Sequence, residues 1–424
     1  MLSVSREERN NVSYRIAGID VHKKMLAVVV SEAAEDQLQF QRRKFGALES
    51  DLRLLAAWLA ELGVEEAIME STAQYWKPVW QMLEGQCHLE LAQAQSNRGP
   101  KGRKSDFKDA ERLVRRFLAD ELTLSFVPDA EQALWRTQAR TKVRWSRDRA
   151  RLQNRMEALL EEMRIKLSSV VSDLLGVSAR RMLRAIADGE KDPAQLAAMA
   201  DPALRASRDA LCNALRPVTT LDQRYRTILK QFLDQITFYD EHIRMLDKEL
   251  SESLRPHSDS VERLAAVPGL GVDSAQQIIA EVGPKAATFP CAGALSSWVG
   301  TCPGEEESAG ESSSDHSPKG NRSMRRILNQ AANAAVKAKG TVFEAHYRRL
   351  KGRDPKQHNK AVWAVANRIC RLVWKILHHG VSYEERGHRP SIRAVKKRAA
   401  RLLRELKALG YRVQIDALPQ TASS

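Results

Sequence analysis

Four acidic residues in the first quarter of the chain have the types and spacing that a metal-dependent phosphoryl-transfer site requires. Asp20 ends the apolar run YRIAGID, and Glu70 ends a second strand-like run, EEAIME. Asp106 and Asp109 are spaced i, i+3 at the start of the helical pattern SDFKDAERLVRR, so both carboxylates can face the same way. Two divalent ions held about 3.5–4 Å apart by such acids can activate an attacking oxygen and stabilise a leaving one. We therefore predict that the four acids converge on one metal cluster.

Each acid, taken singly, also fits a structural role. Asp20 fits a turn between two strands, and Glu70 fits a solvated strand end. Asp106 fits a helix N-cap with Asp109 at the third position, close to a capping box that contributes about 1 kcal/mol. His22 either contacts a phosphate or a metal-bound water, or is a turn residue without a catalytic role. The order and spacing of all four acids together favour the metal cluster.

The overall charge indicates a polyanionic partner. The chain has 424 residues, a formal net charge of +15 and a pI near 9.7, which suit two or three domains that bind nucleic acid through phosphates. Its five cysteines form no pair or Cys/His cluster with zinc spacing, as expected of a reduced cytoplasmic protein, here one associated with the nucleoid. No segment has the length of a transmembrane helix, and the N-terminus lacks the apolar core of a signal peptide, so no membrane partner is expected.

The elements that must position the acids belong to an α/β domain over residues 14–125. Three strand-like runs are followed by helix, strand, helix, strand and helix, the order of a ribonuclease-H or RuvC-like fold. Residues 126–256 form a helical region that opens with an Arg-rich helix. Apolar residues later in this region alternate spacings of three and four, which predicts a coiled-coil seam, either between chains or within an intramolecular helical hairpin: Leu229, Phe232, Ile236, Tyr239, Ile243, Leu246 and Leu250.

The third region, residues 257–383, is mainly helical and opens with LAAVPGLGVDSAQQIIAEVG. This pattern resembles a helix-hairpin-helix, in which Gly269 and Gly271 permit a tight turn and the next helix start can bind a phosphate. An ordinary helical hairpin with a glycine cap is consistent with the same sequence. A polar, Ser-rich loop follows, and residues 384–424 hold a basic helix and tail. The fold class is thus α/β plus α.

These residues carry a resemblance to a known family. The chain resembles the DEDD transposases of bacterial insertion sequences, the IS110 family, and within it the IS1111 branch. The resemblance covers most of the chain and rests on these segments: GIDVHKK with Asp20, AIMESTAQYWKPVWQML with Glu70, KSDFKDAERL with Asp106 and Asp109, VPGLGVDSAQQIIAEVG, and WVGTCPGEEESAG with KGNRSMRRIL downstream.

The resemblance implies a recombinase whose RuvC-like domain binds Mg²⁺ through the four acids, with two ions expected and Mn²⁺ as a substitute. A serine in the C-terminal transposase domain would attack DNA and become linked to a phosphate, and the match places it at Ser308. Family members usually carry Lys or Arg where this chain has Glu311, a departure that slightly weakens the expected local DNA contacts but not the assignment of the nucleophile. Implied partners are donor DNA, target DNA, an element-encoded guide (bridge) RNA and further copies of the chain in a dimer or tetramer. The implied nucleic-acid-binding residues are Gly269, Gly271, Lys319, Arg322, Arg325 and Arg326.

Two other function classes fit parts of the sequence. A metal-dependent RuvC-like nuclease or junction resolvase needs the four acids and the basic surface but no serine. A non-catalytic protein that binds RNA and DNA needs only the charge, the hairpins and the coiled coil. The recombinase is favoured because it alone accounts for the C-terminal half.

Overall fold

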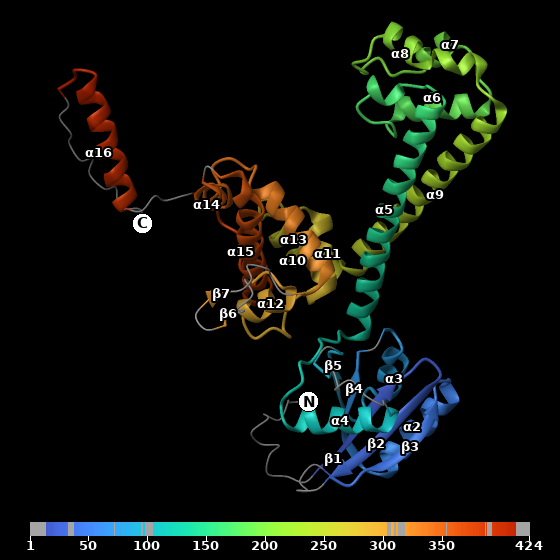
Figure 1. Cartoon of the computed structure of the whole chain (residues 1–424), viewed down its shortest axis with the longest axis vertical. Coiled ribbons are helices and arrows are strands. Elements are labelled where there is room, and N and C mark those ends of the chain that lie inside the picture. The colour runs from blue at the N-terminus through green and yellow to red at the C-terminus, as the bar shows by residue number, and fades with distance from the viewer. Residues whose placement is uncertain are drawn as a thin grey trace. The chain divides into compact units, whose positions relative to one another are not determined.

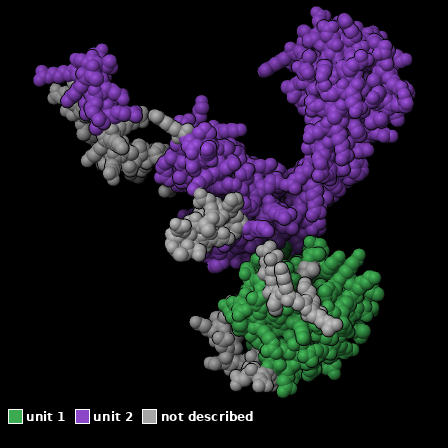
Figure 2. Space-filling view, in the orientation of Figure 1, with its two compact units in different colours: residues 1–128 green, residues 129–424 purple. Residues whose placement is uncertain are grey.

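The computed structural model divides the chain into two compact units, residues 1–128 and 129–424 (Figures 1 and 2). The described residues are 14–32, 38–71, 73–94, 96–97, 105–302, 307–308, 311–312, 319–352, 354–385, 387 and 392–412, with the backbone alone at 307–308, 311–312 and 392–398.

The first unit is built on a mixed five-stranded sheet with the order β3-β2-β1-β4-β5. β1 is antiparallel to β2 and parallel to β4, and β4 is parallel to β5. This order confirms the predicted ribonuclease-H-like fold. The strands are β1 (Arg15–Val21), β2 (Met25–Glu32), β3 (Gln41–Gly46), β4 (Val64–Glu70) and β5 (His88–Ala92).

Burial explains why these segments become strands. β1 and β2 are apolar on both faces because helices cover both sides of the sheet. β3 is an edge strand, and its four exposed residues QRRK protect that edge with polar and positively charged side chains. The sequence LQFQRRKF, residues 38–45, has a strand-like pattern, and the strand begins three residues into it, at Gln41.

Helices cover the two faces of the sheet (Figure 1). On one face, α2 (Glu49–Glu61) and α3 (Trp76–Leu83) pack on the odd-numbered β1 residues Ala17, Ile19 and Val21. On the other face, α4 (Asp106–Leu118) packs on Ile16 and on Ile68 of β4. Alternation of side chains along a strand therefore decides which residues face α4.

Gly18 brings α4 close to the central strand β1. A Cβ atom at this position would lie 2.5 Å from the Ala110 carbonyl oxygen and 2.7 Å from Val114 Cγ2, both in α4. Real Cβ atoms do not approach other atoms so closely, so only glycine permits this helix-to-strand distance. The N-terminal turn of α4 is thereby placed beside the carboxyl ends of β1 and β4.

The second unit begins with two long helices that pack against each other, α5 (Ala130–Glu162) and α9 (Gln223–Ser253). They run antiparallel, because Gln138 bonds Glu249 near one end and Arg149 pairs with Asp240 further along. This is the intramolecular hairpin that the seam also predicted, and Leu229, Ile236 and Leu250 are buried. Dimerisation through the seam stays a prediction.

A helical cluster closes the hairpin at the α5 C-terminus. Its helices share one apolar core with α5 and α9, to which Met156, Leu183 and Leu215 contribute. Arg226 of α9 lies fully inside and donates to the carbonyls of Ile186, Glu190 and Val218. The helices are η1 (Leu167–Ser169), α6 (Val177–Asp188), α7 (Pro193–Ala198), α8 (Arg208–Leu215) and η2 (Arg216–Thr220).

A second core of this unit is built on α15 (His358–His379), a largely buried helix against which α10, α12, α13 and α14, bounded below, pack. Trp374 in α15 donates its indole N–H to the carbonyl of Phe289 at 2.8 Å. The other elements are η3 (Arg255–His257), α10 (Ser258–Ala265), α11 (Val272–Val282), α12 (Ala292–Val299), β6 (Glu307–Ser308), β7 (Glu311–Ser312), α13 (Arg322–Ala335), α14 (Val342–Lys351), η4 (Pro355–Gln357) and the basic α16 (Ile392–Ala408). Within the described residues, every helix is too short or too polar to span a bilayer.

Candidate active site

Sheet register brings Asp20 and Glu70 to the same edge of the first unit. Ile19 of β1 pairs with Met69 of the parallel strand β4, so the next residue of each strand is Asp20 and Glu70. Ile19 and Met69 face the α2 and α3 layer. Asp20 and Glu70 therefore both face α4 at the carboxyl ends of their strands.

Helix α4 supplies the other two acids. It begins at Asp106, directly after the N-cap residue Ser105, so Asp106 is not the N-cap of the capping-box alternative. Ala110, Leu113 and Val114 form the buried face of α4. Asp106 and Asp109 lie on the turns that precede these residues, toward the sheet edge.

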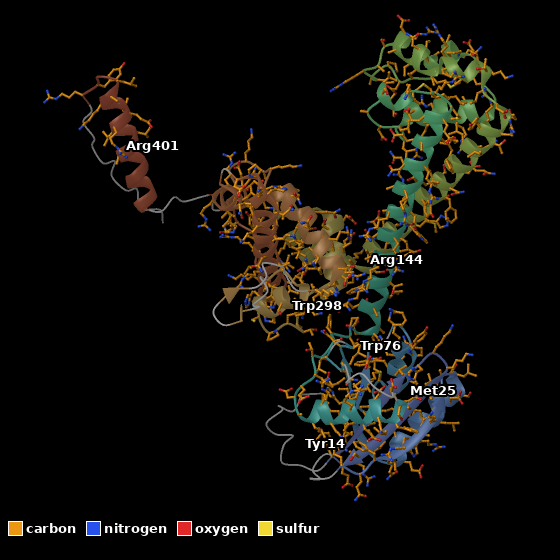
Figure 3. The ribbon with its side chains drawn as sticks, viewed as in Figure 1. Tyr14, Met25, Trp76, Arg144, Trp298 and Arg401 are labelled. Atoms are coloured by element: carbon orange, nitrogen blue, oxygen red, sulfur yellow. The ribbon has the colours of Figure 1, made fainter. Side chains whose placement is uncertain are left out.

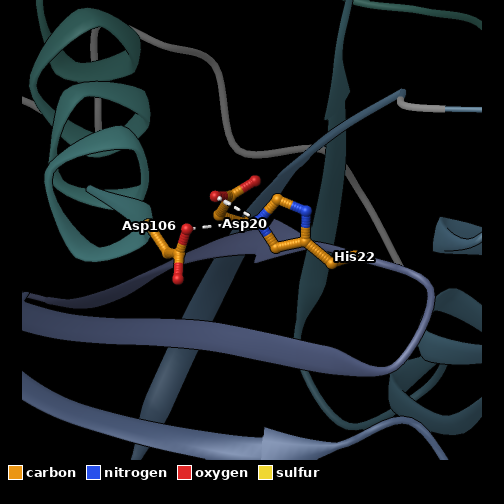
Figure 4. Close-up of side chains that lie close together, drawn as sticks. All are labelled: Asp20, His22 and Asp106. Carbon is orange, nitrogen blue, oxygen red and sulfur yellow. Dashed lines mark hydrogen bonds and ion pairs between the residues drawn. The ribbon is translucent and has the colours of Figure 1, made fainter. Parts of the chain in front are cut away.

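The closest group in this site contains Asp20, His22 and Asp106 (Figure 4). Their possible ligand atoms all lie within 4.8 Å of one another. His22 Nε2 is 3.1 Å from Asp20 Oδ2 and 3.6 Å from Asp106 Oδ1. One imidazole thus contacts carboxylates from β1 and α4, segments that are far apart in the sequence.

Glu70 and Asp109 lie near Asp20 but are held by other partners. Asn97 Nδ2 donates to Glu70 Oε2 at 2.9 Å, and an Arg112 guanidinium nitrogen lies 2.7 Å from Asp109 Oδ1. Asp106 has a cation too, because Lys44 Nζ is 3.3 Å from its Oδ2. The structure therefore brings the four acids to one edge, with Asp20 and Asp106 in the tighter group.

Asp20 is the least exposed of the four acids, and its pKa is raised. Burial is the main cause, and the negative charges of Asp109 and Glu70 add to it, whereas His22 lowers the pKa. The carboxylates therefore repel one another across this edge. A bound divalent cation would relieve that repulsion.

The donors present fit a hard divalent ion. Carboxylate oxygens are the ligands that Mg²⁺ and Mn²⁺ prefer, whereas an imidazole nitrogen is better suited to ions such as Zn²⁺ or Fe²⁺, so His22 is the least typical donor of this set. The sequence left His22 without a decided role, although it stands at i+2 from Asp20 next to the strand end. That spacing places both side chains on one face and was the available signal.

Ser308 lies in the second unit, in the short strand β6, which pairs with β7. Its side chain is outside the described residues. Hydrogen bonds connect the chain before this segment to the chain after it. Asn321 N donates to Trp298 O at 3.2 Å, and Arg325 donates to the Gly300 carbonyl. Gly320 is pressed against the Val299 carbonyl, where a Cβ would clash.

The four basic residues implied to bind nucleic acid differ in their surroundings. Lys319 and Arg322 are exposed. Arg325 bonds Gly300 O and lies 4.4 Å from the Trp363 ring centroid, and Arg326 donates to Gln277 and Gln330. Arg325 and Arg326 thus stabilise the packing of α13.

The two turn glycines also differ. Gly269 has φ of +90° and lies so close to Ala331 of α13 that a Cβ would clash with that carbonyl. Gly271 is the N-cap of α11 and has open space around it. Gly269 therefore has a packing role, and Gly271 leaves the start of α11 accessible.

Several cationic side chains of the Arg-rich helix α5 form ion pairs inside the second unit. Glu281 of α11 is buried and accepts from Arg140 Nε and a terminal nitrogen at 2.8 Å each, and from Asn321 at 2.9 Å. Burial would raise the pKa of Glu281, but Arg140, Arg136 and Asn321 outweigh burial and lower it. Lys142 pairs with Asp247 and Asp273. The exposed cations of α5 include Arg144 (Figure 3), Arg147 and Arg155.

Two transposase family models match successive parts of the chain. A DEDD-type model of IS110 elements, described as "Transposase", matches residues 17–165. A second model, described as "Transposase IS116/IS110/IS902 family", matches residues 261–348. The first match includes all four acids, and the second includes Ser308.

Two curated proteins are similar to parts of this chain. A "Probable family 20 transposase" of Pseudomonas aeruginosa is 26% identical over 158 residues, which are 37% of this chain and 46% of that protein. An "Insertion element IS900 uncharacterized 42 kDa protein" of Mycobacterium paratuberculosis is 26% identical over 172 residues, 40% of this chain and 42% of that protein. The matches span less than half the length of either relative.

Proposed function

Since the chain belongs to the IS110 family of DEDD transposases, we propose that it cuts and rejoins DNA strands as the transposase of an insertion sequence. The observation that carries the proposal is the group of Asp20, His22 and Asp106 at the sheet edge, with Glu70 and Asp109 beside it. In this proposal the four DEDD acids hold two Mg²⁺ ions. The ions would neutralise the scissile phosphate and lower the pKa of an attacking hydroxyl.

The proposed nucleophile is Ser308. Its Oγ would form a bond to phosphorus as the bond to one deoxyribose oxygen breaks; the serine proton leaves to solvent and the released oxygen takes up a proton. The phosphoserine would keep the bond energy for rejoining the strands. Support comes from the family match over residues 261–348 and from the hydrogen bond between Asn321 and Trp298, which joins the chain segments on either side of Ser308.

The proposed partners are donor and target DNA, a guide RNA encoded by the element, and further copies of the chain. The net charge of +15 supports the nucleic acids, and the resemblance to the IS1111 branch supports the RNA. We also propose the domain division 14–125, 126–256, 257–383 and 384–424. Helix α9 would pair with its equivalent in a dimer or tetramer, so that acids and serine come from different protomers.

Trapping a covalent protein–DNA adduct and mapping its residue tests the nucleophile. Ser308→Ala should abolish the adduct, whereas Ser312→Ala, in the adjacent strand β7, should keep it. Folding and DNA binding of both variants should equal those of the native chain. An adduct formed by Ser308→Ala would exclude Ser308 as the nucleophile.

A RuvC-like nuclease without a covalent intermediate remains the second candidate. The observation that favours it is that all four acids belong to the first unit alone. Cleavage without any adduct, lost in Asp20→Ala but retained in Ser308→Ala, would identify this activity. Mixing these two variants tests the shared site, because restored strand transfer requires protomers that complement each other.

A further inference from the structure

A hollow in the second unit lies outside the site described above. It has a volume of about 550 Å³, within the range of roughly 300–1,000 Å³ that ligand pockets have. Its walls come from α14, α15 and the segment after α15. Three cations of α15, spaced i, i+3 and i+7 on one helix face, line it: Arg368, Arg371 and Lys375.

These three cations outnumber the two acids near the hollow, Glu384 in its lining and Glu385, which accepts from the lining residues Tyr383 and Val342. In the part of the chain that the structure describes, no ion pair involves these three cations, and Glu384 is the one acid among the lining residues. His346 adds no charge near neutral pH, because burial and the neighbouring Arg368 and Arg349 lower its pKa. A hollow of about 520 Å³ beside α6 is different, since its Arg180 and Arg184 are paired with Asp240 and Asp234.

An aromatic wall faces these cations. Tyr383 and Phe343 stack with ring centroids 6.2 Å apart and an interplanar angle of 12°. Glu385 holds this wall in place, because it accepts from the Tyr383 hydroxyl and from the Val342 amide at 3.1 Å. Val342 and Leu372 extend the apolar surface. The hollow thus combines an anion-binding side with a flat apolar side.

We propose that this hollow binds one unstacked nucleotide of a single-stranded nucleic acid. Arg368, Arg371 and Lys375 bind its phosphates, and the base packs against Tyr383 and the adjacent apolar wall. A single strand is required, because a base inside a duplex is covered on both faces by its neighbours.

The hollow also adjoins the chain that leads to Ser308. Asn367, which lines it, donates to Thr301 Oγ1 at 3.4 Å and to Cys302 Sγ at 3.8 Å. A strand held there would pass beside the start of that segment. The proposal rests on the nucleic-acid partners of the proposed function, but its test needs neither metal nor cleavage, so the two can fail separately.

Binding of short labelled oligothymidylate and oligouridylate to the full chain, measured by fluorescence anisotropy in EDTA, tests the cationic side. The double variant Arg371→Gln/Lys375→Gln should bind more weakly, with a salt dependence shallower by about 1.4, since each lost phosphate contact removes roughly 0.7 on single strands. The control is Arg244→Gln/Lys248→Gln on α9, an exposed pair with similar spacing and the same change of charge, which should keep the native salt slope. Equal losses in both double variants would overturn the proposal, as would equal weakening for duplex and single strand.

The aromatic side has its own test. Tyr383→Ala should weaken binding roughly 5- to 150-fold, the range that corresponds to about 1–3 kcal/mol for one stacked base. Tyr383→Phe keeps the ring but loses the hydrogen bond to Glu385, so it should bind far more tightly than Tyr383→Ala. An abasic strand should bind Tyr383→Ala and the native chain equally. Tighter binding of oligouridylate would identify the bound strand as RNA, and tighter binding of oligothymidylate would identify it as DNA. If Tyr383→Ala binds both probes with the native affinity, the proposed contact between the base and the aromatic wall is wrong.

Discussion

Replacing Gly18 by alanine should displace helix α4 and with it half of the acid cluster. The added Cβ would lie 2.5 Å from the Ala110 carbonyl oxygen and 2.7 Å from Val114 Cγ2. Unstrained contacts of these kinds are about 3.3 Å and 3.5 Å. The helix must therefore retreat by roughly 0.8 Å, which exceeds the tolerance of about 0.5 Å for a functional site.

The expected loss of stability is about 1–2 kcal/mol. Overpacking of a close interior contact costs about 1–3 kcal/mol, while the reduced freedom of the unfolded chain offsets about 0.4–1 kcal/mol. Thermal unfolding in EDTA measures this loss, and repeating it with Mg²⁺ or Mn²⁺ measures how much the ion stabilises the site. Gly18→Ala should lower the melting temperature by several degrees and reduce the rise that the metal produces.

Two further variants make this test specific. Gly293→Ala, in α12, is the matched control, because its Cβ would meet Cys291 Sγ at an ordinary 3.5 Å. Val114→Ala added to Gly18→Ala removes one of the two close contacts but leaves the Ala110 carbonyl, so it should not restore metal binding. If Gly18→Ala keeps both the native melting temperature and the native metal response, the argument for a glycine-dependent approach of α4 is wrong.

Three other outcomes are expected. Glu281→Gln should cost about 3 kcal/mol at neutral pH in urea unfolding, because it leaves the buried Arg136 without its charge partner; Arg140, whose side chain is 43% exposed, adds little. Because folding lowers the pKa of Glu281, its carboxylate stabilises the folded chain above the unfolded-state pKa near 4.5, and this stabilisation is lost as the pH falls through the folded-state pKa. The difference in unfolding free energy between the native chain and the variant should therefore shrink in acid, and a difference that does not depend on pH would contradict this. Asp20→Asn should raise the melting temperature in EDTA, because burial and the acidic neighbours of Asp20 destabilise its charged form. The same variant should abolish the stabilisation by Mg²⁺. A lower melting temperature in EDTA would contradict the repulsion among the carboxylates. Neutralising the exposed cations of α5 should make the salt dependence of duplex DNA binding shallower by about 2.7, roughly 0.9 each, and an unchanged slope would exclude them from the contact: Arg144, Arg147 and Arg155.

The sheet could be predicted because its information is local. The apolar runs of β1 and β2 and the positions of Asp20 and Glu70 at strand ends are visible in single segments. The contact of His22 with Asp106 could not be predicted, because it depends on how closely α4 approaches β1, which Gly18 decides.

Charges were the least predictable part of the chain. A basic segment looks available for phosphates, yet Arg140 binds Glu281, which is 141 positions away. Arg325 similarly bonds the Gly300 carbonyl and lies over the Trp363 ring, and its binding to nucleic acid stays a prediction. Such pairings arise from tertiary packing and have no local signature in the sequence.

Helix α4 follows all the strands of the first unit's sheet in the sequence, and this order limits what a prematurely terminated chain can form. Synthesis that stops before residue 106 yields all five strands of the first unit's sheet but only two of the four acids. The same fragment leaves Ile16, Val29 and Ile68 without the helix that covers them. Such a product would lack half of the carboxylates and expose an apolar sheet face that favours aggregation and proteolysis. A truncated product of this kind therefore cannot assemble the proposed four-acid metal site.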